Sequence, residues 1–369
     1  MTDLTGFEAG QTNPLDVILA TGGYDNTIRF WEAWSGICVK SINHPQSQIN
    51  RLAISPDKRH LAVAGNAHVR LYDVAIATAS NHPAPNQGSH TTPASEQTSQ
   101  HQQQAHAQTG LLQSFPHNGN VTSVAWPKES KWFVTGCEDG AMRIWDTRTP
   151  VAQRTVDFVF HLQGGAVLTT APHADIAIHP NQGEIISCDQ SGAIKIWDLA
   201  ADSCTHELVY QFPEDDVPQR SVSIASDNSC LVAGNNSGNV FLWNISTSGV
   251  GGYTDLQAEA TFAAHKRYCL KVLLSPDVRV LCHRLLATCS ADTTIKIWSL
   301  TPNQPPKLDK TLYDHQRWVW DLAFSADSAY LVSASSDHSA RLWELASGQT
   351  VRQYSGHSKP CVAVALNDS

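Results

Sequence analysis

Apolar and polar residues alternate along most of the chain in short runs, and turns rich in Gly, Asn, Asp and Ser separate the runs. Alternation with a period of two between such turns is typical of antiparallel β-hairpins. One phrase recurs: two apolar residues, a small-residue turn, then alternating apolar residues that end in an aromatic ring. The closing aromatic residues of the seven copies are Trp31, Tyr72, Trp145, Trp197, Trp243, Trp298 and Trp343. The pattern predicts an all-β chain built from a repeated unit.

Each copy supplies the two middle strands of a four-stranded unit, because a short apolar strand precedes it and another follows it. The closing aromatic residues are 41, 73, 52, 46, 55 and 45 residues apart. A WD40 blade takes about 40–45 residues, so the longer intervals indicate insertions in loops. We therefore predict a single domain, residues 1–369, that folds as a seven-bladed WD40 β-propeller.

The two ends of the repeat array complement each other. The array begins at a second strand, Val17–Gly22, and ends with an unaccompanied first strand, Cys361–Leu366. Pairing of these two segments would complete one shared blade and leave no free sheet edge where the ring closes. We expect the C-terminal strand to pair with the N-terminal blade.

Four copies carry polar side chains in one register. An Asp lies six residues before the closing Trp, a Ser or Thr lies four residues before that Asp, and a His precedes the first strand. The sets are His357, Thr21, Asp25 and Trp31; His117, Thr135, Asp139 and Trp145; His265, Thr288, Asp292 and Trp298; His315, Ser333, Asp337 and Trp343. Such groups could be read as catalytic triads, but an enzyme needs one site and this set repeats around the ring. We interpret them as structural hydrogen-bond networks. The other copies have Asn66, Ser191 and Ser237 at the Asp position, and we expect looser turns there.

One equivalent position marks where the chain enters each first strand from the same face of the ring. It is occupied by Gln48, Asn120, Pro172, Tyr268, Trp318 and Pro360. Trp318 and Trp320 are two residues apart, so both side chains point to the same side of their strand. They either pack between blades or anchor a partner at the rim. The anchor is favoured because Trp343 already supplies the usual blade tryptophan, and because Arg317, Arg267 and Tyr268 lie beside the pair.

The charge balance narrows the classes of partner. The chain has 25 Lys and Arg against 34 Asp and Glu, a net charge of −9, with one short basic stretch at Lys266 and Arg267. Nucleic-acid binding needs clustered cations, so we expect no nucleic-acid partner. No apolar run approaches the roughly 20 residues of a membrane helix, so we expect neither membrane insertion nor secretion. Nine cysteines without a C-x-x-C spacing predict reduced thiols in a cytosolic protein.

Three insertions interrupt the repeats. Residues 80–110 are rich in Gln, His, Ser, Thr and Pro and show no apolar periodicity, so we predict a disordered loop. The irregular spacing of its histidines disfavours a metal site. Two more apolar insertions, residues 159–172 and 278–283, fall in loops between strands.

Several longer phrases are more specific than the repeat. They include ILATGGYDNTIRFWEAWSGIC, HPNQGEIISCDQSGAIKIWDL, RWVWDLAFSADSAYLVSASSD and the terminal NDS. Outside the insertions, essentially the whole chain resembles the small WD40 subunit of target-of-rapamycin (TOR) kinase complexes, a G-protein-β-subunit-like protein. The resemblance implies a non-catalytic subunit of TOR complexes 1 and 2. Such a subunit binds and stabilises the C-lobe of a phosphatidylinositol-kinase-related kinase and supports growth signalling. In that family, positions matching Gln48, Trp318 and Trp320 contact the kinase.

Other function classes remain alternatives. A generic WD40 adaptor or a G-protein-β-like scaffold ordinarily adds an N-terminal coiled coil, and the sixteen residues before the first strand show no heptads. An enzyme would need a non-repeating cluster of titratable groups, and we find none in the sequence. We expect no catalytic residues, no cofactor and no metal. The expected protein is a monomeric propeller in the cytoplasm that reaches endomembranes through the kinase complex.

Overall fold

The computed structural model describes residues 17–78, 109–156, 160–161, 167–168, 171–201, 203–208, 217–247, 254–276, 284–302 and 304–368. Most of the predicted disordered loop 80–110, most of the insertion 159–172 and all of the insertion 278–283 lie outside these ranges. Within the described part, residues 160–161 and 167–168 form a short antiparallel pair, β10 (Phe160–His161) and β11 (Val167–Leu168).

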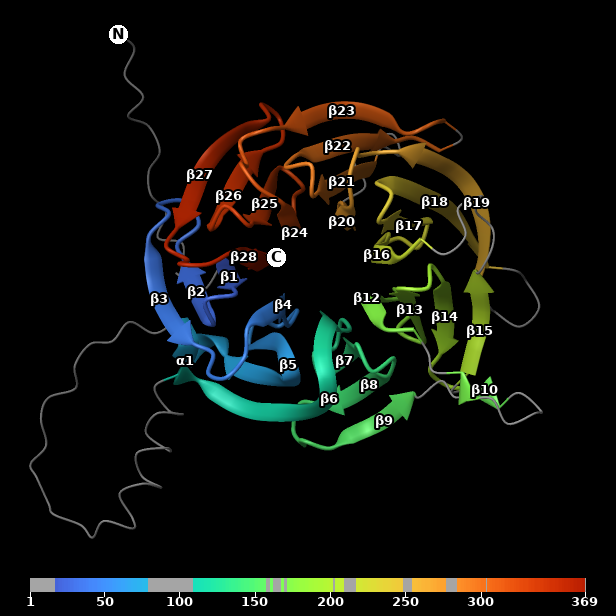
Figure 1. Ribbon diagram of the computed structural model, residues 1–369, viewed down its shortest axis with the longest axis horizontal. Helices are drawn as coiled ribbons and strands as arrows, with labels where there is room; N and C mark the ends of the chain where they lie inside the picture. The colour runs from blue at the N-terminus through green and yellow to red at the C-terminus, as the bar shows by residue number, and fades with distance from the viewer. Residues whose placement is uncertain are drawn as a thin grey trace, which may run out of the picture.

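Antiparallel sheets make up the rest of the described chain, which confirms the all-β propeller architecture (Figure 1). The first sheet contains β28 (Cys361–Asn367), β1 (Ile18–Gly23), β2 (Thr27–Trp31) and β3 (Cys38–Asn43). The next contains β4 (Ile49–Ile54), β5 (His60–Asp73), β6 (Leu111–Ala125), β7 (Trp132–Cys137), β8 (Met142–Asp146) and β9 (Ala152–Val156).

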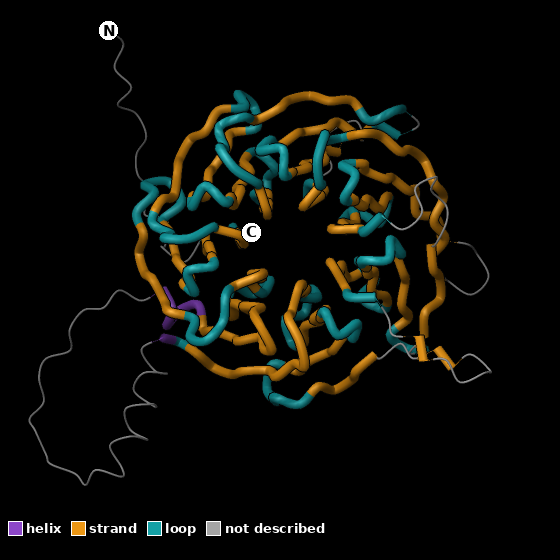
Figure 2. The backbone as a smooth tube through the Cα atoms, in the orientation of Figure 1, coloured by secondary structure: helices purple, strands orange, loops and turns teal. Residues whose placement is uncertain are grey.

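Four more sheets complete the ring, each with four strands in chain order. They are β12 (His173–Ile178), β13 (Glu184–Asp189), β14 (Ile194–Asp198) and β15 (Ser203–Leu208); β16 (Gln219–Ile224), β17 (Cys230–Asn235), β18 (Asn239–Thr247) and β19 (Thr254–Ala263); β20 (Cys269–Leu274), β21 (Arg284–Ser290), β22 (Ile295–Leu300) and β23 (Lys307–Leu312); β24 (Val319–Phe324), β25 (Tyr330–Ser335), β26 (Ser339–Glu344) and β27 (Gln349–Ser355). The helix α1 (Val74–Thr78) lies beside the outer strand β3 (Figure 2).

The prediction of seven separate blades is wrong, because hydrogen bonding divides the described residues of the ring into six sheets besides the small β10–β11 pair. The copies that close at Tyr72 and Trp145 share the six-stranded sheet. Strand β5 pairs with β4 through Leu61–Gly65 and with β6 through Asn66–Tyr72. Strand β6 then continues and pairs with β7 from Val121 onward. Two long, bulged strands therefore run on where the repeat pattern suggested breaks.

The last strand of the chain lies beside the first. Strand β28 pairs antiparallel with β1, with Ile18 opposite Asn367 and Gly22 opposite Ala363. Figure 1 shows the red β28 next to the blue β1 on the inner side of the first sheet. The inner edge of β1 is therefore covered by backbone hydrogen bonds.

The hydrophobic core lies between neighbouring sheets. One cluster joins Leu19 and Trp31 of the first sheet to Val332 and Leu342 of the last. Packing is close enough to require glycine in β1, because a Cβ at Gly22 would come 2.6 Å from Cγ2 of Ile49 in β4. Recurrent small residues in the repeated phrase thus let one sheet approach the inner strand of the next.

Among the described residues, no helix is long and apolar enough to cross a membrane. The eight described cysteines are free thiols, and Cys282 lies outside the described ranges.

Candidate protein-docking rim

A hydrogen-bond network fixes the loop before β24. The indole Nε1 of Trp343 donates to Oγ of Ser333 over 2.8 Å, and that oxygen lies 2.7 Å from Nε2 of His315. On the other side of the imidazole ring, Nδ1 of His315 lies 2.7 Å from Oδ2 of Asp337. His315, Ser333 and Trp343 are all buried. The chain of bonds satisfies polar groups that would otherwise be costly to bury.

Two neighbouring sheets repeat this geometry. His265 lies 2.8 Å from Thr288 and 2.9 Å from Asp292, and Trp298 donates to Thr288 over 3.1 Å. In the first sheet, His357 lies 2.8 Å from Thr21 and 3.1 Å from Asp25, and Trp31 donates to Thr21 over 2.8 Å. The last of these networks joins residues from opposite ends of the chain.

The carboxylates of these networks stay ionised. Burial on its own would raise the pKa of Asp292, but hydrogen bonds from His265 and Thr294 outweigh it and the pKa is lowered. Burial alone would likewise raise the pKa of Asp337, but hydrogen bonds from His315 and Ser339 lower it. The pKa of Asp25 is also lowered, although by burial alone it would rise. Each histidine loop is thus tied to a negative charge on the following turn.

The fourth predicted set does not assemble as expected. His117 lies 2.8 Å from Thr135, and Trp145 donates to Thr135 over 2.9 Å. Asp139, however, binds Nη1 and Nη2 of Arg143 at 3.3 and 2.6 Å and makes no hydrogen bond with His117. His117 lies inside β6 and its Nδ1 bonds the carbonyl of Phe115 at 3.0 Å. Without a carboxylate partner, burial lowers the pKa of His117 to about 4.

Two turns without the predicted Asp are closed by a residue two positions earlier. The Oδ1 of Asp189 accepts the backbone N–H groups of Ser191 and Ala193 and the hydroxyl of Ser191. Asn235 accepts the N–H groups of Ser237 and Asn239. The signal was in the sequence, because Asp and Asn commonly bond their own backbone two residues on.

The turn at Asn66 is accompanied by a pair of histidines that the sequence analysis did not single out. Nδ1 of His44 lies 3.0 Å from the hydroxyl of Tyr72, and its Nε2 lies 3.2 Å from Nε2 of His68. Burial, with the positive charge of Arg70 nearby, lowers the pKa of His44 to about 3 and that of His68 to about 4. Both rings are therefore neutral at pH 7.

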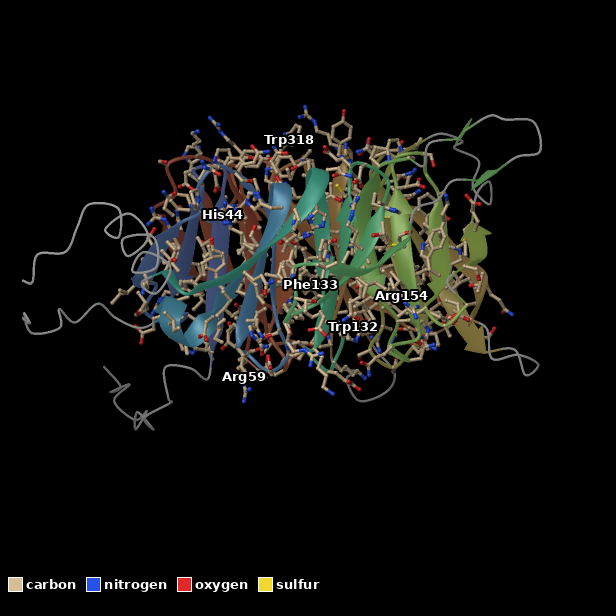
Figure 3. The ribbon with its side chains drawn as sticks, turned by 90° about the horizontal axis from the view of Figure 1, so that it is seen from below. His44, Arg59, Trp132, Phe133, Arg154 and Trp318 are labelled. Atoms are coloured by element: carbon tan, nitrogen blue, oxygen red, sulfur yellow. The ribbon has the colours of Figure 1, made fainter. Side chains whose placement is uncertain are left out.

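The predicted rim residues lie at one face of the ring. Figure 3 places Trp318 at the face opposite Arg59. Trp318 is 37% exposed and Tyr268 is 45% exposed. Their rings meet edge to face, with centroids 6.1 Å apart. Gln48 and Arg317 are also exposed.

Trp320 sits deeper than Trp318. Its ring centroid is 5.5 Å from that of Trp318, and its Nε1 donates to Oγ of Ser336 over 2.6 Å. The backbone carbonyl of Trp318 accepts from both N–H of Ser336 and Oγ of Ser335 at 2.9 Å. Trp320 is half-buried and supports the exposed Trp318, so an apolar side chain is held at the surface by a rigid base.

An ion cluster that no sequence motif indicates lies on the inner strands. Arg51 of β4 donates to Asp321 of β24 over 2.7 Å and to Asp175 of β12 over 3.1 Å. Lys271 of β20 donates to Asp175 over 2.8 Å. Burial alone would raise the pKa of Asp175, but Lys271 and Arg51 lower it to about 2. Side chains from four sheets are therefore paired next to the axis of the ring.

A second exposed apolar group lies around the outer part of the first sheet and α1. Its members are Trp34, Ile37, Val39, Ile76 and Leu112, with exposed fractions of 41–62%. Among the described residues, no group of three or more His, Cys, Asp or Glu side chains could hold a metal ion.

The model of the WD domain, G-beta repeat family matches residues 9–32, 36–73, 110–146, 257–299 and 306–344. A Schizosaccharomyces pombe protein, the target of rapamycin complex subunit Wat1, is 49% identical over 352 residues, which cover 95% of this chain and 96% of that protein. The chain belongs to the LST8/Wat1 family of WD40 proteins. Other LST8/Wat1 family members extend the match. The target of rapamycin complex subunit LST8 of Saccharomyces cerevisiae is 45% identical, covering 96% of this chain and all of that protein. LST8 of Bos taurus is 40% identical, covering 96% and 95%. The family resemblance noted in the sequence is confirmed.

Proposed function

We propose that this chain is a non-catalytic subunit of TOR complexes 1 and 2 that binds the C-lobe of the kinase domain and stabilises it. The names of the LST8/Wat1 relatives support membership of a TOR complex. The proposed binding surface is the rim formed by Gln48, Tyr268, Arg317, Trp318 and Trp320. The propeller acts as one domain and as a single copy in the cytoplasm, and it reaches endomembranes through the kinase.

One observation carries the proposal: Trp318 is exposed while its backbone and its neighbour Trp320 are fixed by hydrogen bonds. An aromatic ring held at the surface loses little conformational entropy when a partner covers it. Tryptophan and arginine are the side chains most often found as energetic centres of protein interfaces. A rim that exposes both side by side fits a protein partner.

The test is a Trp318→Ala, Trp320→Ala double variant of the full chain. Loss of two central tryptophans should weaken kinase binding by about a thousandfold, since each such side chain contributes about 2 kcal/mol or more. Binding is measured by co-purification with the TOR kinase of the same organism and by titration. The thermal midpoint should fall by several degrees while the variant stays folded, because Trp320 loses one hydrogen bond and the contacts of a half-buried ring.

Trp34→Ala is the matched control, since Trp34 is an exposed tryptophan away from the rim. It should leave kinase binding unchanged. Unfolding of the double variant, with Trp318→Ala alone still binding normally, would contradict the rim as the docking site. Mass spectrometry of proteins purified with the wild-type chain tests the class: a large phosphatidylinositol-kinase-related kinase supports the proposal, and small Gγ-like chains would favour a G-protein-β-like scaffold.

A further inference from the structure

Three consecutive loops on the rim repeat one four-residue pattern: a histidine, any residue, a cation and a residue with a ring in its side chain. The loops are His265–Tyr268, His315–Trp318 and His357–Pro360, with sequences HKRY, HQRW and HSKP. They lead into β20, β24 and β28, the inner strands of sheets that follow one another around the ring (Figure 1). The corresponding segment that begins at His117, HNGN, has neither the cation nor the ring-containing side chain.

The backbone of each loop is fixed at two points. The network carboxylate accepts the N–H of the residue after the histidine, at 3.4 Å for Lys266, 3.3 Å for Gln316 and 2.9 Å for Ser358. The carbonyl of the fourth residue accepts an N–H from the neighbouring turn. Those bonds are Ala291 to Tyr268 at 3.1 Å, Ser336 to Trp318 at 2.9 Å and Tyr24 to Pro360 at 3.0 Å.

This repetition sets the three cations at equivalent positions. Arg267, Arg317 and Lys359 each stand two residues after the buried histidine, and all three are exposed. Within the described residues, their side chains have no hydrogen-bond or ion-pair partner. Their charges are therefore available to a partner, on backbone that needs no further ordering.

The acidic groups nearby are already engaged. Asp292, Asp337 and Asp25 each bond their network histidine. Asp314, the exposed acid in these loops, binds the hydroxyl of Thr350 and lies 3.7 Å from Arg341. Lys266 adds a further exposed cation. The exposed charges of this arc are thus mainly cations, on a chain whose net charge is −9, because the side chains of Asp292, Asp337 and Asp25 are only 17%, 11% and 5% exposed.

We propose that Arg267, Arg317 and Lys359 form a cationic ladder that binds an acidic segment of the kinase, while Tyr268 and Trp318 pack on apolar residues of the same segment. The inference rests on the proposed function and adds the chemistry of the partner. Guanidinium groups pair with carboxylates in a two-pronged geometry, and exposed charges of this kind chiefly accelerate association. The ladder selects and orients the kinase segment before the tryptophans are covered.

The experiment measures the rate at which the full chain associates with TOR kinase, at low and high salt. The kinase is purified from cells depleted of this propeller protein. The Arg267→Glu, Arg317→Glu, Lys359→Glu variant should associate on the order of tenfold or more slowly at low salt. Wild-type association should slow as salt rises, because salt screens exposed charges. The variant should lose that slowing or show the reverse dependence.

The control reverses three exposed cations: Arg59→Glu at the face opposite Trp318, and Lys128→Glu and Lys131→Glu in the β6–β7 turn, which Ser130 ties to Asp57 in the turn that holds Arg59 (Figure 3). It changes the net charge equally and should associate within about twofold of wild type, since distant exposed charges are screened. Equal slowing in both variants would overturn the ladder and indicate a general charge effect. Wild-type behaviour of the rim variant, together with loss of binding on Trp318→Ala, would overturn the ladder and leave the proposed function standing.

Failure of the wild-type chain to bind the kinase at all would remove the proposed function itself. Anionic lipid vesicles and duplex DNA serve as probes of other anionic partners. Binding of either probe with higher affinity than the kinase, lost in the rim variant, would also overturn the proposal.

Discussion

Two parts of the ring bury histidines in opposite electrostatic settings. In the sheets β20–β23 and β24–β27, His265 and His315 each face a carboxylate at 2.9 and 2.7 Å. At the six-stranded sheet β4–β9, His44 in the loop before β4 and His117 in β6 face hydroxyl and carbonyl groups instead, at 3.0 Å. Both settings satisfy the ring nitrogens. They differ in whether an ionised carboxylate or only neutral groups lie beside the histidine ring.

The contrast teaches that one repeat can serve two ends. The histidine–carboxylate pairs lie under the loops that carry Arg267, Arg317 and Trp318, and they fix the backbone of the rim. The neutral histidines pack on or lie in the six-stranded sheet β4–β9, which contains two copies of the repeated phrase. The same register of residues is therefore used for surface display in one region and for core packing in the other.

Acidification should separate the two regions most strongly. The pKa values of His44 and His117 are lowered to about 3 and 4, so below pH 6.5 the unfolded chain takes up protons that the folded sheet does not. Stability of β4–β9 is therefore lost as pH falls from 6.5, by about 2 kcal/mol for each of the two histidines at pH 5. The lowered pKa values of Asp292 and Asp337 act in the other window: their stabilisation is present above about pH 4 and is lost only below it.

Hydrogen exchange followed by mass spectrometry at pH 7.5 and pH 5 measures this difference, after correction for intrinsic exchange rates. Peptides covering β5 and β6 should lose protection, and peptides covering β21 and β25 should keep it. A His117→Asn variant should show a smaller loss in β6. Equal loss in both regions would remove the distinction between the two settings.

Removing the carboxylate should affect the two regions unequally. Asp337→Asn breaks a charged hydrogen bond to buried His315 and should lower the free energy of unfolding by about 2 kcal/mol. Asp139→Asn, the matched change in the six-stranded sheet, weakens the ion pair with Arg143 at a carboxylate that is 21% exposed, against 11% for Asp337, and should cost less, about 1 kcal/mol. Urea denaturation of both full-length variants gives the comparison, and a larger loss for Asp139→Asn would reverse it.

Replacing the closing tryptophan should erase the difference. Trp343→Phe and Trp145→Phe each remove an indole donor to a buried hydroxyl, Ser333 in one sheet and Thr135 in the other. Each should cost about 1–2 kcal/mol, because each loses one hydrogen bond and some buried ring area. Thermal denaturation should give shifts of similar size. A clear gap between the two variants would show that the tryptophan also depends on the carboxylate.

The all-β propeller and the exposure of Tyr268 and Trp318 could be predicted from the sequence because their signals are local. Alternation gave the strands, and fixed offsets linked His315, Ser333, Asp337 and Trp343 without any knowledge of the ring. The sequence missed the division into sheets, because turn residues around Asn66 do not reveal whether a strand bends or breaks. It also misplaced Asp139, since an arginine four residues on competes with a histidine, and geometry alone decides between them.

The inner ion cluster had no local signal at all. Arg51 and Asp321 are 270 positions apart, and each lies in an ordinary first strand. Only closure of the ring brings them together. Contacts of this kind depend on the whole topology and are the least accessible to reasoning from one sequence.

That cluster connects Arg51 to Asp175 in the next sheet of the ring and to Asp321 in a sheet that lies beyond the first sheet. Substituting it would leave Asp321 without its cation and Asp175 with Lys271 alone, so the effects of changes at positions 51, 175 and 321 cannot add independently. Redesign of the inner strands therefore has to change these three side chains together, although they are far apart in the sequence.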